Sequence, residues 1–98
     1  MLRLGKPIQF IWDKGNKEKN WLKHKVINKE CEEVFFDKNK KITKDIFHSK
    51  KEQRYILIGK TKKNRCLFTV FATRKNKIRI ISARDLNRKE KKLYEKSA

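Results

Sequence analysis

The residue types that could act on a phosphate group gather in the last quarter of the chain. Arg79, Arg84 and Arg88 recur within ten residues, although the chain has only seven arginines against 22 lysines. A guanidinium can donate two parallel N–H groups to a phosphate, which an ammonium cannot do. RNA carries its own nucleophile, the 2′-hydroxyl, so a metal-free ribonuclease needs only a base, an acid and cations around the phosphorane. The chain has residues for each of these roles.

Candidates for the base and the acid lie before the arginines. His48 titrates near neutral pH and is the natural general base or acid; the alternative is a loop histidine that hydrogen-bonds Glu52. Glu52 and Arg54 share one face of an extended strand, where a structural ion pair is the alternative to a role in the site. Tyr94 shares a helix face with Glu90 and could stack on a base or help proton transfer, or simply pack with a hydrated hydroxyl.

Strand alternation complicates a single arginine site. Arg74 closes one expected strand, Arg79 lies inside the next, and Arg84 lies at its end. Arg79 and Arg84 therefore start on opposite faces, unless a β-bulge near Ser82 turns one of them. The predicted catalytic set is His48, Glu52, Arg74, Arg79, Arg84 and Tyr94, and the predicted RNA contacts are Arg54, Lys62, Lys63 and Arg88.

No residues stand at spacings that suit a metal ion or another cofactor. Four acidic residues are interpreted as solvated side chains near a helix N-terminus, where the helix dipole favours them: Glu30, Glu32, Glu33 and Asp37. The two cysteines, Cys31 and Cys66, are 35 residues apart and sit in apolar runs that are typical of small buried thiols. We therefore predict that the protein binds no metal and no cofactor.

The charge of the chain indicates a polyanionic partner. The net charge is +18 over 98 residues, and nucleic acid is the usual partner of such a surface. Two alternatives are a lysine-biased genome and an acidic protein partner. No apolar run approaches the ~20 residues that span a bilayer, and no secretory segment precedes Pro7, so a cytoplasmic protein is expected. Residues 1–7 are expected to form a flexible lead, and residues 8–98 a single domain.

The pattern along the chain predicts an α+β domain with a small antiparallel sheet, N-terminal helices and a C-terminal helix. Strands are expected over 8–12, 54–59, 65–73 and 77–83, with a hairpin turn at 75–76 and a loop or weak edge strand over 38–44. Helices are expected over 14–24, capped by Asp13, and over 29–36, capped by Asn28; a third is capped by Asn87 and Glu90. Trp12 and Trp21 are expected to be core and helix anchors rather than base-stacking platforms.

The chain resembles the BrnT family, the toxins of a type II toxin–antitoxin system. The resemblance is strongest in the string from Ile78 to Arg84, followed by Glu90 and Tyr94. It extends to earlier residues, which keep the family's order and spacing: Phe10-Ile11-Trp12-Asp13, Asn20, Lys23-His24, Val34-Phe35, His48-Ser49, Glu52-Gln53-Arg54 and Gly59. The family's usual glycine after His24 is Lys25 here, and Lys25 must adopt the backbone conformation that glycine adopts in the turn.

The resemblance implies a fold similar to the RelE-type ribonuclease toxins. It also implies RNA cleavage that stops translation, and neutralisation by a BrnA-like antitoxin whose ribbon-helix-helix end binds DNA. The toxin–antitoxin complex would then bind operator DNA and repress its own operon. The alternative from the residues alone is a basic module that binds nucleic acid without cleaving it.

Overall fold

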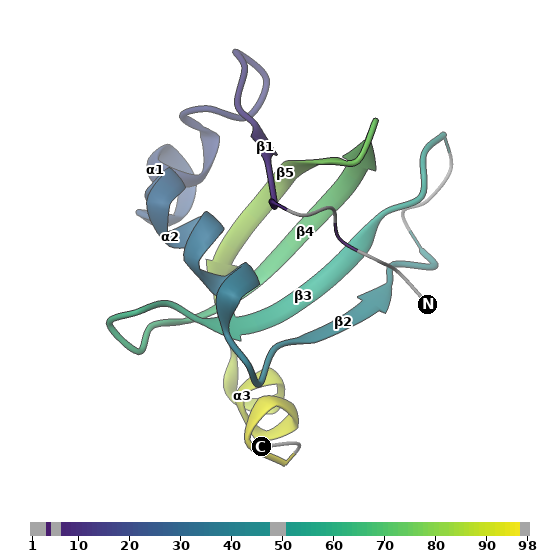
Figure 1. Cartoon of the computed structure of the whole chain (residues 1–98). Coiled ribbons are helices and arrows are strands. Elements are labelled where there is room, and N and C mark those ends of the chain that lie inside the picture. The colour runs from purple at the N-terminus through teal and green to yellow at the C-terminus, as the bar shows by residue number, and fades with distance from the viewer. Residues whose placement is uncertain (1–3, 5–6, 48–50, 97–98) are drawn as a thin grey trace.

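The computed structural model describes residues 4, 7–47 and 51–96, and over these residues the chain is an α+β domain built on one five-stranded sheet (Figure 1). The strands are β1 (Phe10–Ile11), β2 (Lys41–Lys44), β3 (Tyr55–Lys60), β4 (Cys66–Arg74) and β5 (Lys77–Asp85). The helices are α1 (Lys19–His24), α2 (Asn28–Glu33), the 3₁₀-helix η1 (Val34–Phe36) and α3 (Arg88–Lys96). The predicted class is confirmed, and among the described residues no helix is long and apolar enough to cross a membrane.

The sheet has the order β1-β5-β4-β3-β2. Short connections make β3, β4 and β5 antiparallel neighbours, as predicted. β2, in the segment expected to be a loop or weak edge strand, pairs antiparallel with β3. The Lys75-Asn76 turn that joins β4 to β5 has both φ angles positive, at 50° and 67°, which is the geometry of a type I′ hairpin. The expectation of a wholly antiparallel sheet was wrong at one edge, where β1 pairs with β5 in parallel. Because most of the chain separates these two strands, no short loop constrains their relative direction.

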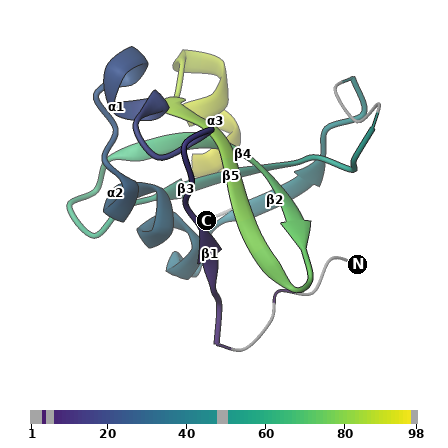
Figure 2. The same ribbon diagram turned by 90° about the horizontal axis from the view of Figure 1, so that it is seen from above.

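The core lies on the inner face of the sheet, under α1, α2 and η1. Phe35 of η1 packs edge-on against Phe10 and Phe71, with ring centroids 5.2 and 5.0 Å apart. Gly59 allows this approach, because a Cβ there would lie only 3.0 Å from the carbonyl oxygen of Val34. Leu4, inside the segment expected to be a flexible lead, packs against the same core. Figure 2 shows α1 and α2 together on one side of β5, with α3 beyond its C-terminal end.

Two predicted helix starts were wrong. Asp13 caps no helix, because α1 begins only at Lys19; residues 13–17 form a turn in which the Asp13 carboxylate accepts the N–H of Gly15 at 2.8 Å. Asn28 is the first helical residue of α2 and Ile27 is its N-cap, with the Ile27 N–H donated to Glu30 at 3.1 Å. At Asp13, the polar side chain satisfies a local backbone group in a turn instead of capping the helix.

A β-bulge in β5 decides which face its arginines occupy. Val70 pairs with Ser82 and Phe71 pairs with Ile80, so Ile81 is an extra residue without a partner on β4. Before the bulge Ile78 and Ile80 face the core, and after it Ala83 does. Arg79 and Arg84 therefore lie together on the outer face. The sequence predicted that the two arginines would share a face only if a β-bulge near Ser82 turned one of them, and the bulge at Ile81 does so.

Candidate functional site

Five of the six predicted catalytic residues are among those the structure describes, and they lie on the outer face of the sheet in two separate groups. The hairpin-end cluster, beside the β4–β5 turn, consists of Asp13, Glu52, Arg54, Arg74 and Arg79. The α3-end cluster consists of Asp37, Lys60, Arg84, Glu90 and Tyr94. The register pairs Arg79 with Ala72 and Arg84 with Phe68, at opposite ends of β5. Five residues of strand separate the two arginines, which corresponds to about 16 Å.

In the hairpin-end cluster, Glu52 and Arg74 form a bidentate pair. The Nε and Nη2 atoms of Arg74 each donate to a different oxygen of Glu52, both at 3.0 Å. These hydrogen bonds, with the charges of Arg74, Arg54 and Arg79, lower the pKa of Glu52 below its usual value. They raise the pKa of Arg74 in return. Glu52 is therefore an ionised carboxylate at neutral pH, surrounded by three guanidinium groups.

Arg79 pairs with an acidic residue of this cluster but keeps one buried donor that no described residue accepts. Its Nη2 donates to Asp13 at 3.0 Å, and only 16% of its side chain is exposed. Its Nε is buried and has no hydrogen-bond partner among the described residues. A buried N–H without a partner costs about 1–3 kcal/mol, so proteins rarely keep one without a reason. A phosphate oxygen would satisfy such a donor.

Asp13 is a residue of this cluster that the sequence did not reveal, because it was interpreted as a helix cap. The Asn16 side chain fixes its loop by donating to the carbonyl oxygens of Ile11 at 2.8 Å and Ile80 at 2.9 Å. Asn16 also accepts the Asp13 N–H at 2.8 Å. Gly15 lets the guanidinium approach, since a Cβ there would lie 2.7 Å from Nη2 of Arg79. The Asp-Lys-Gly-Asn sequence is typical of a turn and could have indicated this arrangement.

In the α3-end cluster, both Nη atoms of Arg84 donate to neighbouring groups. Its two Nη atoms donate to the two oxygens of Glu90 at 2.7 and 2.8 Å, and its guanidinium lies 4.1 Å from the ring centroid of Phe68. Glu90 also accepts the Asn87 N–H at 2.9 Å, and the Asn87 side chain accepts the Glu90 N–H at 2.9 Å. This is the predicted capping box, which is confirmed. Arg84 thus joins the end of β5 to the start of α3.

Tyr94 is the buried residue of α3, and its hydroxyl donates a hydrogen bond to Asp37 at 2.6 Å. Burial opposes the ionisation of Asp37, but hydrogen bonds from Tyr94 and from the N–H groups of Asn39 and Lys60 outweigh it and lower the pKa of Asp37. Burial and the Asp37 charge raise the pKa of Tyr94. A groove of about 630 Å³ opens beside this pair, and its lining includes Lys60 and Lys62.

The predicted RNA contacts also divide between the two ends. Arg54 belongs to the hairpin-end cluster, as its effect on Glu52 shows. Lys62 and Lys63 are exposed in the β3–β4 turn, and Arg88 is exposed at the start of α3, at the other end of the sheet. His48 lies outside the described residues. The structure thus brings together Glu52, Arg74 and Arg79, and separates them from Arg84 and Tyr94.

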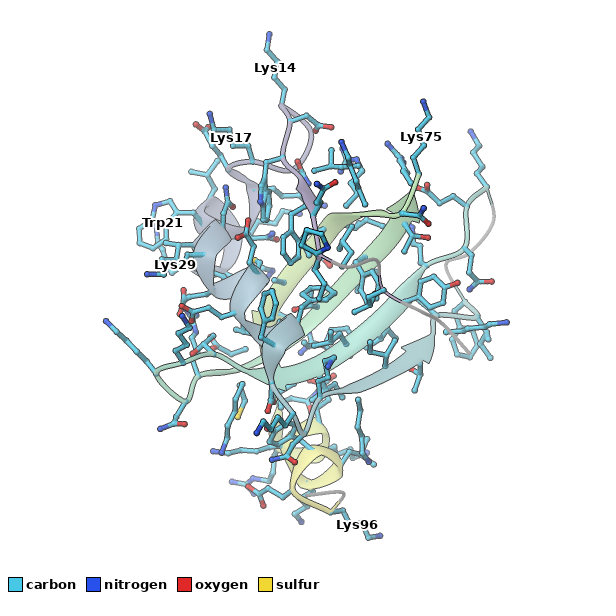
Figure 3. All side chains as sticks on the ribbon, in the orientation of Figure 1. Lys14, Lys17, Trp21, Lys29, Lys75 and Lys96 are labelled. Carbon is cyan, nitrogen blue, oxygen red and sulfur yellow. The ribbon has the colours of Figure 1, made fainter. Side chains whose placement is uncertain are left out.

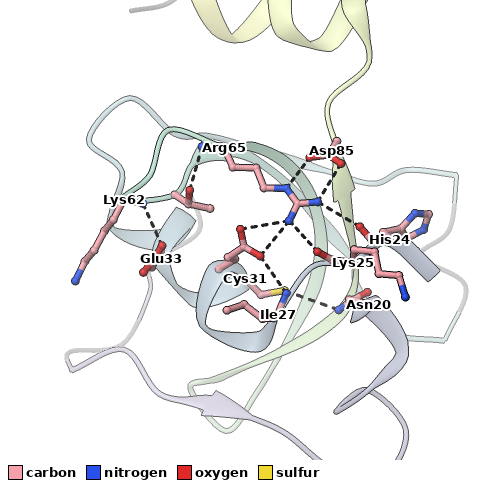
Figure 4. Close-up of polar contacts among 11 residues, drawn as sticks. Asn20, His24, Lys25, Ile27, Cys31, Glu33, Lys62, Arg65 and Asp85 are labelled. Atoms are coloured by element: carbon pink, nitrogen blue, oxygen red, sulfur yellow. Dashed lines mark hydrogen bonds and ion pairs between the residues drawn. The ribbon is translucent and has the colours of Figure 1, made fainter. Parts of the chain in front are cut away.

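Arg65, which the sequence did not single out, joins four elements (Figure 4). It makes two hydrogen bonds to Asp85 at 2.7 and 3.0 Å and two to the oxygens of Glu30 at 3.1 and 3.3 Å. It also donates to the carbonyl oxygens of His24 and Lys25, at the C-terminal end of α1. The hydrogen bonds with Asp85 raise the pKa of Arg65 and lower that of Asp85. Because its donors are spent on the protein's own groups, its role is structural.

Within the described part of the chain, no three histidine, cysteine or acidic side chains are grouped to hold a metal ion. Both cysteines are free, and burial raises the pKa of the Cys31 thiol to about 12. Cys31 is therefore a neutral core residue, as expected from its apolar run.

Comparison with known proteins identifies the family. The family model described as "Ribonuclease toxin, BrnT, of type II toxin-antitoxin system" matches residues 12–90, which include every residue of both clusters except Tyr94. A search of curated proteins gave no match. The resemblance seen in the sequence is thus confirmed over most of the chain. The chain belongs to the BrnT family of ribonuclease toxins of type II toxin–antitoxin systems.

Proposed function

We propose that this toxin is a metal-independent endoribonuclease that cleaves RNA through the 2′-hydroxyl, and that the hairpin-end cluster is its active site. One observation carries the proposal: a carboxylate that Arg74 holds ionised lies near Arg79, a guanidinium with an unused buried donor. The carboxylate can accept a proton, and the guanidinium can bind the phosphate whose charge grows in the transition state.

In the proposed reaction, Glu52 takes the proton of the 2′-hydroxyl as its oxygen attacks the adjacent phosphorus. Arg79 donates to the non-bridging phosphate oxygens, while Arg74 keeps Glu52 oriented. The bond from phosphorus to the 5′-oxygen breaks, and that oxygen takes a proton from an acid, for which His48 stays the candidate. The products are a 2′,3′-cyclic phosphate and a 5′-hydroxyl. Solvent then returns the proton from Glu52 to the acid.

The bidentate pairing of Arg84 with Glu90 favours the hairpin end over the α3 end. To bind phosphate, Arg84 would have to release both oxygens of Glu90, which also belongs to the α3 capping box. Tyr94 is a poor acid or base near pH 7, because its pKa is raised and its proton is held by Asp37. We assign Arg84 and Tyr94 to the positioning of α3, and the exposed Lys62, Lys63 and Arg88 to attraction of the RNA backbone.

In the cell, we propose that this cleavage inhibits translation in the cytoplasm. The type II family implies a protein antitoxin. We propose that this partner is a BrnA-like ribbon-helix-helix protein, and that operator DNA is bound through the complex.

Cleavage of a defined RNA by the purified chain in EDTA tests the proposal. We expect fragments with 5′-hydroxyl and 2′,3′-cyclic phosphate ends, identified by end labelling and mass spectrometry. Glu52→Gln should lower the single-turnover rate by about 10²–10⁴-fold, the range for loss of a general base. The control is Glu95→Gln, an equal change of charge at an exposed position on α3.

Three results would contradict the proposal in different ways. Cleavage that EDTA abolishes and Mg²⁺ restores would show a metal-dependent enzyme. RNA that binds but stays intact would support the non-catalytic binding module. Equal rates for Glu52→Gln and the parent chain would move the active site away from the hairpin end.

A further inference from the structure

The first two helices carry an exposed apolar surface that the proposed chemistry does not use. Trp21 and Leu22 of α1 and Ile27 before α2 are 49%, 69% and 46% exposed. A groove of about 480 Å³ lies among them, lined by Lys17, Glu18, Trp21, Leu22, Ile27 and Asn28. We call these residues the α1 patch. The expectation that Trp21 anchors the helix to the core was wrong, because half of its side chain faces solvent.

Lysines surround this patch. Residues 14–29 contain six lysines and a single acidic residue, Glu18. Figure 3 shows Trp21 on the outside of α1, between Lys17 and Lys29, with all three side chains pointing away from the sheet. The Lys25 ammonium lies 5.0 Å from the centroid of the Trp21 ring. The patch therefore combines an apolar centre with a cationic rim.

The backbone at Lys25 is a second sign that this surface is selected for binding. Lys25 ends α1 with φ 55° and ψ 39°, a left-handed conformation that costs free energy for any residue except glycine. The Arg65 guanidinium holds the Lys25 carbonyl oxygen at 2.9 Å, so the turn is fixed. In place of the less strained glycine, the chain keeps a cation over an exposed indole. A strained residue of this kind is often retained for function.

We propose that the α1 patch is the docking surface for the antitoxin, and that it receives an amphipathic segment with acidic side chains beside one or two apolar ones. Apolar side chains would fill the groove beside Trp21, and carboxylates would pair with Lys17, Lys25 and Lys29. Exposed aromatic anchors inside a charged rim are typical of protein interfaces. Trp21 and the lysines would suit either RNA or a protein segment. The exposed Leu22 and Ile27 favour the protein segment, because they offer RNA neither a donor nor a ring.

The proposal rests on the antitoxin partner that the family implies, but not on the proposed active site. The patch lies on α1 and α2, which cover the inner face of the sheet, whereas Glu52, Arg74 and Arg79 lie on the outer face. Binding at the patch and cleavage of RNA should therefore respond to different substitutions.

The test is the affinity of the full chain for the full-length antitoxin encoded beside it, measured by calorimetry. Leu22→Glu should weaken binding by about 100-fold, the scale of losing an interface hot spot and adding a repelled charge. The matched control is Leu93→Glu, on α3, because Leu93 is 52% exposed and Lys89, Lys92 and Lys96 border it. The control should change the affinity by less than about twofold. Both variants should cleave RNA at the parent rate.

Lys25→Gly provides a variant that cannot act by unfolding the protein. Glycine relieves the left-handed strain, so the melting temperature should rise by about 4 °C. Loss of the ammonium should weaken antitoxin binding by about fivefold. Higher stability with lower affinity would support a direct role of the cation in docking.

Other outcomes overturn the proposal. Parent affinity in Leu22→Glu, or an equal loss in Leu93→Glu, would show that the antitoxin binds elsewhere. A variant that binds the antitoxin normally but binds RNA more weakly would make the α1 patch an RNA contact. No binding by the parent chain would refute both the docking surface and the antitoxin partner, while leaving the ribonuclease proposal intact. Conversely, a parent chain that binds the antitoxin through the patch but does not cleave RNA would refute only the reaction.

Discussion

The two ends of the outer sheet face carry similar residues in different states. At each end an arginine forms a bidentate pair with a glutamate: Arg74 with Glu52, and Arg84 with Glu90. At the α3 end, Glu90 also caps a helix, and the Arg84 guanidinium lies 4.1 Å from the centroid of the Phe68 ring. At the hairpin end, a further guanidinium, that of Arg79, has a buried Nε without a partner among the described residues. The same type of ion pair therefore connects two elements of the fold at the α3 end. At the hairpin end it belongs to a charge cluster in which one buried donor has no partner among the described residues.

This difference teaches how to separate a structural arginine from a candidate ligand-binding one. Sequence shows only that an arginine is present, and both ends have one beside a carboxylate. The decisive property is how many of its donors the protein itself uses. Arg84 and Arg65 donate to carboxylates and backbone carbonyl oxygens. Arg79 donates to Asp13 through Nη2, but it also has a buried Nε that no described residue accepts.

Exchanging arginine for lysine at each end should give the largest difference in cleavage rate between the two ends. Arg79→Lys keeps the charge but loses the planar fork, so single-turnover cleavage at saturating protein should fall by on the order of 10²-fold. Arg84→Lys should cleave within about threefold of the parent rate and should instead unfold at a lower urea concentration. The reverse result, a slow Arg84→Lys and a normal Arg79→Lys, would place the active site at the α3 end.

A smaller effect is expected from Tyr94→Phe, which removes one buried hydrogen bond at the α3 end. The change should lower the free energy of unfolding by about 1 kcal/mol, because the Asp37 carboxylate loses its 2.6 Å donor. Urea denaturation followed by circular dichroism measures this. RNA cleavage by the folded variant should be unchanged. A loss of cleavage without a loss of stability would return Tyr94 to the catalytic set.

The pH dependence of stability tests the same end of the sheet. The folded pKa of Asp37 lies below its ordinary value of 3.8, so between these two values the unfolded chain binds more protons. The stabilisation from Asp37 is therefore complete above the unfolded pKa and is lost as the pH falls through the folded pKa. Compared with the parent, Asp37→Asn should be less stable near pH 6. The two should converge well below pH 3.8, and a constant difference at all pH values would refute the assignment.

The smallest expected effect is on RNA affinity. Lys62→Ala removes one exposed ammonium of the β3–β4 turn, and many other basic residues still attract the backbone. Filter binding should show a loss of about two- to threefold, with a shallower dependence on salt and an unchanged chemical step. Lys75→Ala, at the β4–β5 turn, provides the comparison at the hairpin end. A large drop in the cleavage rate for Lys62→Ala would give the α3 end a catalytic role after all.

The sequence by itself determined the elements whose signals are local. Two turn residues at 75–76 specified the β4–β5 hairpin, and the Asn87–Glu90 spacing specified the start of α3, because each depends on neighbours within four residues. The family was also recognisable from the order and spacing of motifs. Asp13 and Asn28 were assigned to the wrong positions, because a polar residue before a helical pattern can serve a turn or a cap equally well.

Only the tertiary structure decided how the candidate residues are grouped. Strand alternation along the chain predicts opposite faces for Arg79 and Arg84, and the bulge at Ile81, which depends on pairing with β4, puts them on the same face. The pairing of Glu52 with Arg74 rather than with Arg79 likewise follows from contacts between segments that are distant in sequence. Asp13 reaches Arg79 across 66 residues of sequence. Local sequence cannot encode such a contact, because it forms only when β1 adds to the edge of the sheet beside β5.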